Sequence, residues 1–187
     1  AQSLLAILSS FYAVYHGYEG LNNIAKNIVI LRSYLENGLK KLGFVLNKGV
    51  RFDSFDVYSS KSVAIHKSAI KNGFNLRILP LGAEIDNATG FGISLDELSD
   101  IDEIHKILNF IADVIDKNID FEEIPKDNLF HLEGIPLREE KFLQQNVFED
   151  FQSETDLMRY IFSLAEKDFS LVDGMIPLGS CTMKLNA

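Results

Sequence analysis

Two runs of apolar residues at helical spacing open the chain and predict two consecutive helices. In the first run, apolar side chains recur every three or four positions from Leu4 to Tyr15, which is typical of an amphipathic helix. His16-Gly17 then interrupts the pattern. A second run begins near Glu19 and ends at Gly43, the residue type most favoured just beyond a helix C-terminus. The apolar stripe of this second run consists of Leu21, Ile24, Ile28, Leu31, Leu35 and Leu39.

Shorter elements follow between Phe44 and Ile115. Alternating apolar and polar residues predict strands, and apolar residues spaced by three or four predict helices. The expected strands are Phe44–Leu46, Phe52–Tyr58, Phe74–Ile78 and Phe91–Leu95, and the expected helices are Lys61–Lys71 and a helix that runs to Ile115 from the capping box Ser99-Asp100-Ile101-Asp102. This order predicts an α+β fold, with helices on one face of a mixed or antiparallel sheet.

One hydrophobic core is expected to join these helices to the sheet. Residues that share a helical face should pack there together. The expected core residues are Tyr12 of the first helix, Ile28, Leu31 and Leu35 of the second, and Ile104 and Leu108 of the last. The two histidines on the shorter helices, His66 and His105, are expected to face solvent.

The last third of the chain divides into a linker and a final helix. Asn118 to Asp150 has no sustained period and contains Pro125 and Pro136, which predicts an extended linker. Ser153-Glu154-Thr155-Asp156 is a second capping box. The helix that it opens should bury Leu157, Tyr160, Ile161 and Leu164. The expected domains are residues 1–117, 118–152 and 153–187.

Both ends of the sequence predict a piece of a longer protein. Ala1 stands where an initiator methionine is expected, and no capping residue precedes the first helix. At the other end, PLGSCTMKLNA stops within a predicted loop. We therefore expect the chain to be an internal fragment.

Composition and charge narrow the classes of function. The chain has 187 residues, of which 47% are hydrophobic, and its formal net charge is −9. Such an acidic globular protein repels nucleic-acid phosphates. The four histidines fall at no metal-ligand spacing, Cys181 is the only cysteine, and the run Leu4–Tyr15 is shorter than the roughly 20 apolar residues that span a bilayer. We expect no nucleic acid, no metal, no intrachain disulfide and no membrane span.

The segment Gly179-Ser180-Cys181-Thr182 is the clearest candidate for chemistry. It places a thiol, two hydroxyls and backbone N–H groups close together, with Lys184 just beyond, and such a run can approach an anion closely. The alternative is a polar loop without a ligand. Cys181 would need a nearby base to act as a nucleophile, and a small, buried, inert thiol is the other interpretation.

Three stretches of the chain resemble the P protein of the glycine cleavage system, in order and at about the family's spacing. AQSLLAILSSFYAVYHGYEGL resembles the helix that leaves the family's first large domain. FDSFDVYSSKSVAIHKSAIKNGFNLRILPLGAEIDNATGFGISLDE resembles the small domain that follows. SETDLMRYIFSLAEKDFSLVDGMIPLGSCTMKLNA resembles the join into the second half and is the most specific of the three.

The resemblance implies a fold and an activity. The family contains two tandem units of the aspartate-aminotransferase type, the type I fold of pyridoxal-phosphate enzymes, and only the second unit binds the cofactor. The implied enzyme is an aminomethyl-transferring glycine dehydrogenase, which decarboxylates glycine and passes the aminomethyl group to the lipoyl arm of the H protein. Residues 1–117 would belong to the small domain of the first unit, and residues 153–187 would begin the second.

The resemblance implies no catalytic or cofactor-binding residue in this chain. The family holds pyridoxal phosphate through a lysine in a His-Lys motif far beyond residue 187, and His66-Lys67 and His105-Lys106 share only the dipeptide with it. The chain alone should therefore be inactive. By analogy with related enzymes, Ser180, Cys181 and Thr182 would line the active site of the second unit. The implied parent carries both units in one chain and forms a homodimer. It would be cytoplasmic in a bacterium, or lie in the mitochondrial matrix of a eukaryote.

Two other classes of function fit the same pattern of elements. A small α+β domain can be a regulatory module that binds an amino acid, in which case the glycine-rich Gly90-Phe91-Gly92 would form a turn that touches the ligand. It can also be a purely structural interface domain. A large exposed apolar face would favour the structural class over the regulatory one.

Overall fold

The chain forms two compact units. The computed structural model describes residues 2–46, 49–127, 129–130, 132, 137–169 and 174. One unit consists of Ala1–Leu21 with Arg138–Ala187, and the other of Asn22–Leu137. The predicted boundaries at 117/118 and 152/153 concern the organisation of the longer protein and stay a prediction.

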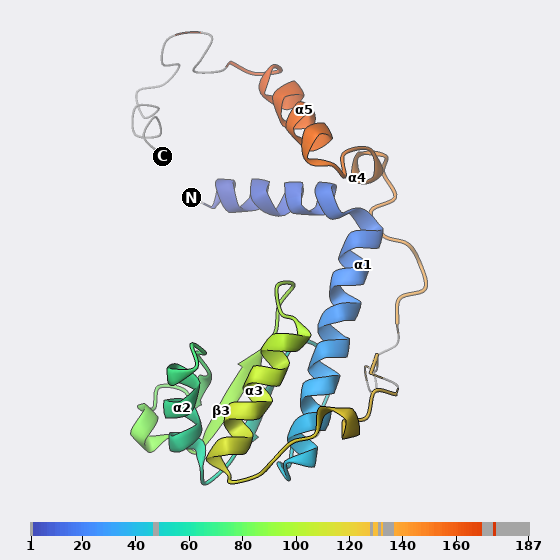
Figure 1. The fold of residues 1–187 in the computed structure, drawn as a ribbon. Coiled ribbons are helices and arrows are strands. Elements are labelled where there is room, and N and C mark those ends of the chain that lie inside the picture. Colours follow the sequence, from blue (N-terminus) through green and yellow to red (C-terminus); the bar gives the residue numbers. More distant parts are fainter. Residues whose placement is uncertain are drawn as a thin grey trace. The chain divides into compact units, whose positions relative to one another are not determined.

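Helix α1 (Ser3–Lys41) contains both predicted helical runs (Figure 1). Its backbone leaves helical geometry at Gly17, with φ 57° and ψ −166°, which glycine adopts without the steric cost of a Cβ. At the C-terminal end, Gly43 has φ 94°. There the N–H of Phe44 donates to the carbonyl oxygen of Leu39 at 3.0 Å and satisfies one of the last carbonyls of the helix. The predicted break and the predicted glycine terminus are both confirmed.

Three strands form one antiparallel sheet in the unit of residues 22–137. They are β1 (Ser54–Tyr58), β2 (Arg77–Leu79) and β3 (Gly90–Ser94). Strand β3 lies in the centre, with the order β1-β3-β2, and Val57 and Ile78 are both paired with Phe91. The predicted α+β class and the antiparallel sheet are therefore confirmed.

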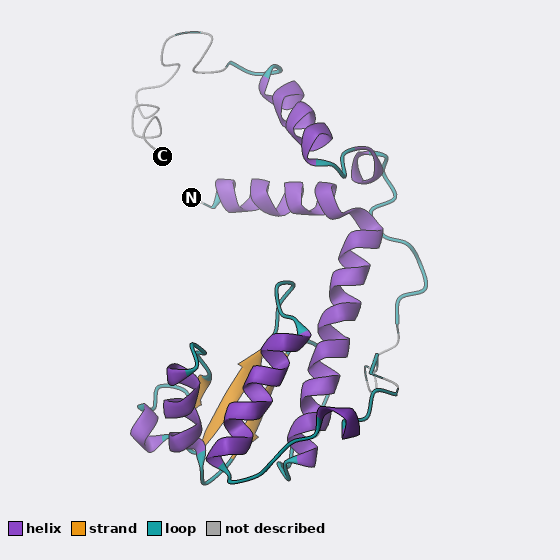
Figure 2. Ribbon diagram, viewed as in Figure 1, coloured by secondary structure: helices purple, strands orange, loops and turns teal. Residues whose placement is uncertain are grey.

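One face of the sheet is apolar and carries the helices. Phe55, Val57, Phe91 and Ile93 alternate with more polar or smaller residues and are buried. Helices α2 (Ser62–Lys71) and α3 (Ile101–Val114) lie over this sheet (Figure 2). On the opposite face Gly92 leaves room for an ion pair between Arg77 and Asp56. The helices therefore cover one face of the sheet, and the other face carries this ion pair together with Tyr58 and the buried Leu79.

Both predicted capping boxes lie at helix starts, but the cap of the first helix is Asp100 and not Ser99, the first residue of the predicted box. Asp100 accepts a hydrogen bond from the N–H of Glu103 at 2.8 Å at the start of α3. Ser153 accepts one from the N–H of Asp156 at 3.2 Å at the start of α5 (Glu154–Ala165). The remaining elements are short: η1 (Ile85–Asn87), η2 (Phe121–Glu123) and α4 (Val147–Asp150).

The unit formed by the two ends of the chain is held by aromatic contacts. The ring of Tyr160 in α5 stacks on Phe151 at 4.2 Å and meets the edge of Phe11 at 6.2 Å. Helix α5 buries none of the four predicted residues: Ile161 is 39% exposed, and Leu157, Tyr160 and Leu164 are half-buried. Among the helices that the structure describes, none is long and apolar enough to cross a membrane.

Three further predictions about local structure are wrong. Phe44–Leu46 is not a strand: it contributes a single bridge, between Leu46 and Val57. The strand expected at Phe74–Ile78 forms later, at Arg77–Leu79. Gly90-Phe91-Gly92 is part of the central strand β3, not a ligand-binding turn. The glycines are needed there because Gly90 lies against the carbonyl of Val57 and Gly92 against the Arg77 side chain.

The core follows the predicted stripe of α1 with one exception. Ile28, Leu31, Leu35, Ile104 and Leu108 belong to one buried cluster with the sheet, as predicted. Tyr12 does not, because it is 39% exposed and lies in the other unit.

Leu35→Ala should lower the free energy of unfolding by about 2–5 kcal/mol, because it deletes buried atoms and leaves a cavity. Leu35 is 0% exposed. Denaturant unfolding followed by circular dichroism measures the change. Leu5→Ala on the same helix is the matched control, since Leu5 is 60% exposed, and it should change stability by no more than about 0.5 kcal/mol. Equal effects of the two substitutions would contradict the assignment of this core.

Candidate functional site

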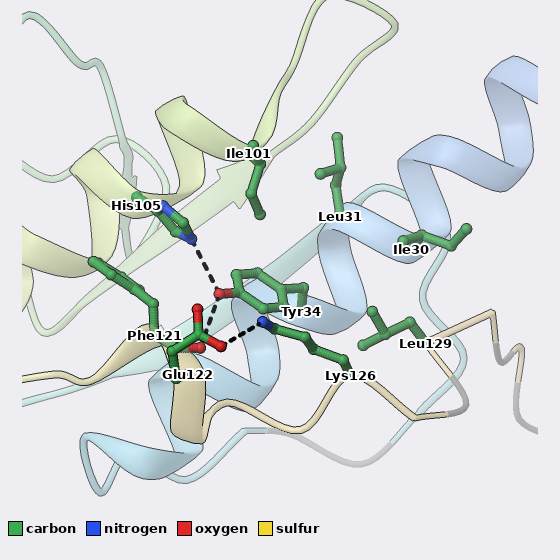
Figure 3. A pocket seen from close by; sticks show the side chains of 9 residues that line it. All are labelled: Ile30, Leu31, Tyr34, Ile101, His105, Phe121, Glu122, Lys126 and Leu129. Atoms are coloured by element: carbon green, nitrogen blue, oxygen red, sulfur yellow. Dashed lines mark hydrogen bonds and ion pairs between the residues drawn. The ribbon is translucent and has the colours of Figure 1, made fainter.

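A cavity of about 320 Å³ opens in the unit of residues 22–137. It lies between α1, the start of α3 and the segment around η2, and Figure 3 shows side chains from all three around it. The lining is almost entirely apolar. It consists of Ile30, Leu31, Tyr34, Ile101, His105, Phe121, Glu122, Lys126 and Leu129.

The segment that closes this cavity is anchored by its own sequence. The carboxylate of Asp120 accepts a hydrogen bond from the N–H of Glu122 at 2.9 Å and starts the turn η2. Ile124 is 2% exposed and joins the core. The side-chain amide of Asn37 in α1 donates to the carbonyl oxygen of Pro125 at 3.1 Å. This part of the predicted linker therefore packs on its own unit.

The inner end of the cavity is polar but internally satisfied. The hydroxyl of Tyr34 lies 3.0 Å from Nε2 of His105 and donates to the carbonyl oxygen of Phe121 at 3.4 Å. The His105 ring stacks on Phe121 with 3.9 Å between the ring centres. Tyr34 is 5% exposed. A buried hydroxyl of this kind is stable because each of its hydrogen bonds has a partner.

Two opposite charges stand at the mouth of the cavity. Nζ of Lys126 lies 3.3 Å from a carboxylate oxygen of Glu122, and their side chains are 56% and 86% exposed. Burial raises the pKa of the Tyr34 hydroxyl above its usual value. Lys126 acts against this rise in pKa, and Glu122 adds to it.

Both helical histidines lie elsewhere than predicted. His105 does not face solvent, because the hydroxyl of Tyr34 on the facing helix binds it. His66 is 2% exposed, and its Nε2 lies 3.1 Å from the carbonyl oxygen of Gly90. Each histidine therefore fixes a helix to a neighbouring element.

The described residues do not fit a pyridoxal-phosphate site. A cofactor lysine must point into an enclosed site, whereas Lys67 and Lys106 are exposed. Lys67 is also paired with Asp86 at 2.7 Å. No group of three or more metal-ligating side chains occurs in the part of the chain that the structure describes.

The candidate residues Ser180, Cys181 and Thr182 lie outside the described residues. Gly179 and Lys184 lie outside them as well. The suggestion that this segment lines an active site therefore stays a prediction.

Sequence reasoning missed the cavity, although part of its signal was present. His105 comes four residues after Ile101 and three before Leu108, which places it on the buried side of α3. Tyr34 follows Leu31 by three residues, on the stripe of α1. No periodicity predicts that a segment 71 residues later in the chain supplies the partner of Tyr34.

Known proteins match this chain along its whole length. The sequence model of the family described as "Glycine cleavage system P-protein" matches residues 1–111. "Glycine dehydrogenase (decarboxylating)" of Prochlorococcus marinus is 53% identical over 188 residues, which cover 100% of this chain and 20% of that protein. The protein of the same description from Psychromonas ingrahamii is 40% identical, over 100% of this chain and 19% of that protein. The chain thus spans about a fifth of the length of these relatives.

Tyr34→Phe should remove part of the loss of stability above pH 10.0, the unperturbed pKa of tyrosine. Because the pKa of Tyr34 is raised in the folded state, the unfolded chain releases this proton first as the pH rises, and unfolding becomes more favourable. Free energies of unfolding measured on both sides of pH 10.0 test this. Identical pH dependence in the two proteins would contradict the raised pKa.

Proposed function

The chain belongs to the glycine cleavage system P-protein family, and we propose that it is the connecting region of a longer glycine dehydrogenase (decarboxylating). The observation that carries this proposal is the alignment of all of this chain with only 19–20% of each relative. In this proposal residues 1–117 belong to the first half of the enzyme and residues 153–187 lead into the second.

The exposed surface of the first helix supports a structural role within a larger protein. No charged residue occurs before Glu19. Leu4, Leu5 and Leu8 are nevertheless 66%, 60% and 54% exposed. Apolar area left in water costs about 25 cal/mol per Å² relative to burial. A helix surface of this kind is stabilised when another part of a protein covers it.

The chemistry of glycine decarboxylation is assigned to parts of the enzyme other than the described residues. Pyridoxal phosphate, when bound, supplies the electron sink that lets the carboxylate leave. The cofactor lysine of the family has no counterpart among the described lysines. The finer features of this proposal come from the family: two aminotransferase-type units, a homodimer, transfer to the lipoyl arm of the H protein, and a cytoplasmic or mitochondrial location.

Ser180, Cys181 and Thr182 are proposed to line the active site of the second unit. Their support is a glycine-led run of small polar side chains in the most distinctive string of the sequence. Such side chains can donate hydrogen bonds to an anionic ligand. Their role would be to bind the substrate or the cofactor by hydrogen bonds and to orient it.

The purified chain should neither bind pyridoxal phosphate covalently nor release CO2 from glycine. The physical reason is that Lys67 and Lys106 are exposed on helices and line no enclosed site that would hold the cofactor in a specific complex. Absorption spectroscopy before and after borohydride reduction, followed by peptide mapping, measures covalent binding. A reduced cofactor on one specific lysine of this chain would contradict the proposal.

In the longer enzyme, Thr182→Ala should lower the rate of glycine turnover by a larger free energy than it lowers the free energy of unfolding, since a polar contact is lost while the packing is kept. Cys181 should react with a thiol reagent in the purified chain and be protected in the cofactor-loaded enzyme. Normal turnover of the Thr182 variant, together with equal Cys181 reactivity in both proteins, would contradict a role at the active site.

A further inference from the structure

The cavity beside Tyr34 has the size and lining of a small-molecule site. Its volume of about 320 Å³ falls at the lower end of ligand pockets, which span roughly 300–1,000 Å³. Leu31, Ile101 and Leu129 form apolar walls. All lining residues belong to one compact unit, and none of them has a role in the proposed function.

The inner end of the cavity selects an apolar group. The hydroxyl of Tyr34 is already bonded to His105 and to the Phe121 carbonyl. A polar group placed there would have to replace those bonds, whereas an aliphatic or aromatic side chain leaves them intact. Burying a polar group without a hydrogen bond is unfavourable. The part of a ligand that enters the cavity is therefore hydrocarbon.

The mouth selects a ligand with both charges. Glu122 and Lys126 pair only with each other across 3.3 Å, among the interactions of the described residues, and both are well exposed (Figure 3). An exposed pair of this kind contributes little to stability, so a ligand can separate the two side chains at small cost. An ammonium group would bind Glu122, and a carboxylate would bind Lys126.

We propose that this cavity binds a free α-amino acid with a medium-sized apolar side chain, of the leucine or phenylalanine type. Such a molecule carries an ammonium and a carboxylate on one carbon, at the mouth, and a hydrocarbon side chain for the interior. An internal peptide segment has neither charge at its Cα and would leave the mouth pair unused. Glycine has no side chain to fill the cavity, so this site is distinct from any site for the substrate of the proposed enzyme.

Calorimetric or NMR titration of the 187-residue chain with leucine should give saturable binding. Glycine should give none. Two analogues of leucine that each keep one charge, 4-methylpentanoate and 3-methylbutylamine, should bind at least about tenfold more weakly, a difference of about 1.4 kcal/mol. Equal binding of leucine and 4-methylpentanoate would contradict recognition of the ammonium group. No saturable binding of leucine or phenylalanine to the folded chain would overturn the proposal.

Substitutions of residues that line the cavity test where leucine binds. Ile30→Trp should abolish it, because Ile30 lines the cavity and is 37% exposed, so that a larger ring can enter from outside. Ile70→Trp is the matched control: Ile70 is 55% exposed on α2, away from the cavity. Glu122→Gln should weaken leucine binding, because the ammonium group loses its partner, and should not weaken binding of 4-methylpentanoate, because Lys126 is freed from its ion pair. Thermal unfolding of each variant confirms folding, and undiminished binding by a folded Ile30→Trp variant would place the ligand elsewhere.

The same titration in the longer protein separates this site from the proposed function. Leucine should bind there with similar affinity, whether or not glycine turnover is observed. Binding that occurs in the chain and disappears in the longer protein would mean that another part of that protein fills the cavity, and would overturn the proposal. Absent glycine turnover with retained leucine binding would contradict only the proposed function.

Discussion

The close approach of α1 to α3 is the constraint on which the rest of the larger unit depends. A Cβ on Gly38 would lie 2.5 Å from Cδ1 of Leu108, so any larger residue there would displace the Leu108 side chain from its place between the two helices. Leu35 and Leu39, on either side of Gly38 along α1, are 0% exposed. The sheet contributes the other half of this core through Phe91 and its neighbours. Without this approach, the buried stripe of α1 would lose its partners.

The cavity is a consequence of that packing. Tyr34 directly precedes Leu35, so the turn of α1 that buries Leu35 also directs the Tyr34 hydroxyl to His105 on α3. The chain then returns from α3 to α1. Nζ of Lys117 donates to the carbonyl oxygen of Leu42 at 2.6 Å, and buried Ile124 holds the segment that carries the mouth residues. The inner end and the mouth of the cavity are thus both fixed by core contacts.

Local signals predicted the helices well, and the contacts between distant segments escaped prediction. Gly17, Gly43 and Ser153 act through neighbours within a few residues, so spacing alone identified them. The helical pattern around His66 predicts which side of the helix it occupies but not what lies opposite that side. The partner of its ring is the carbonyl oxygen of Gly90 in strand β3. The candidate segment Ser180-Cys181-Thr182 rests on residue type and on resemblance, since small polar residues carry no periodic signal.

Two apolar surfaces of this chain differ in charge, and charge determines what each can bind. The N-terminal part of α1 has no charged residue before Glu19 and presents leucines on a convex helix. Such a surface has no polar group that could orient a small solute. It is stabilised most when a broad protein surface covers it and removes its apolar area from water. The cavity is concave, and its only charges are a separable pair of opposite sign at the mouth. A convex uncharged surface therefore suits assembly within a larger enzyme, whereas a concave apolar site with a zwitterionic mouth suits a free amino acid.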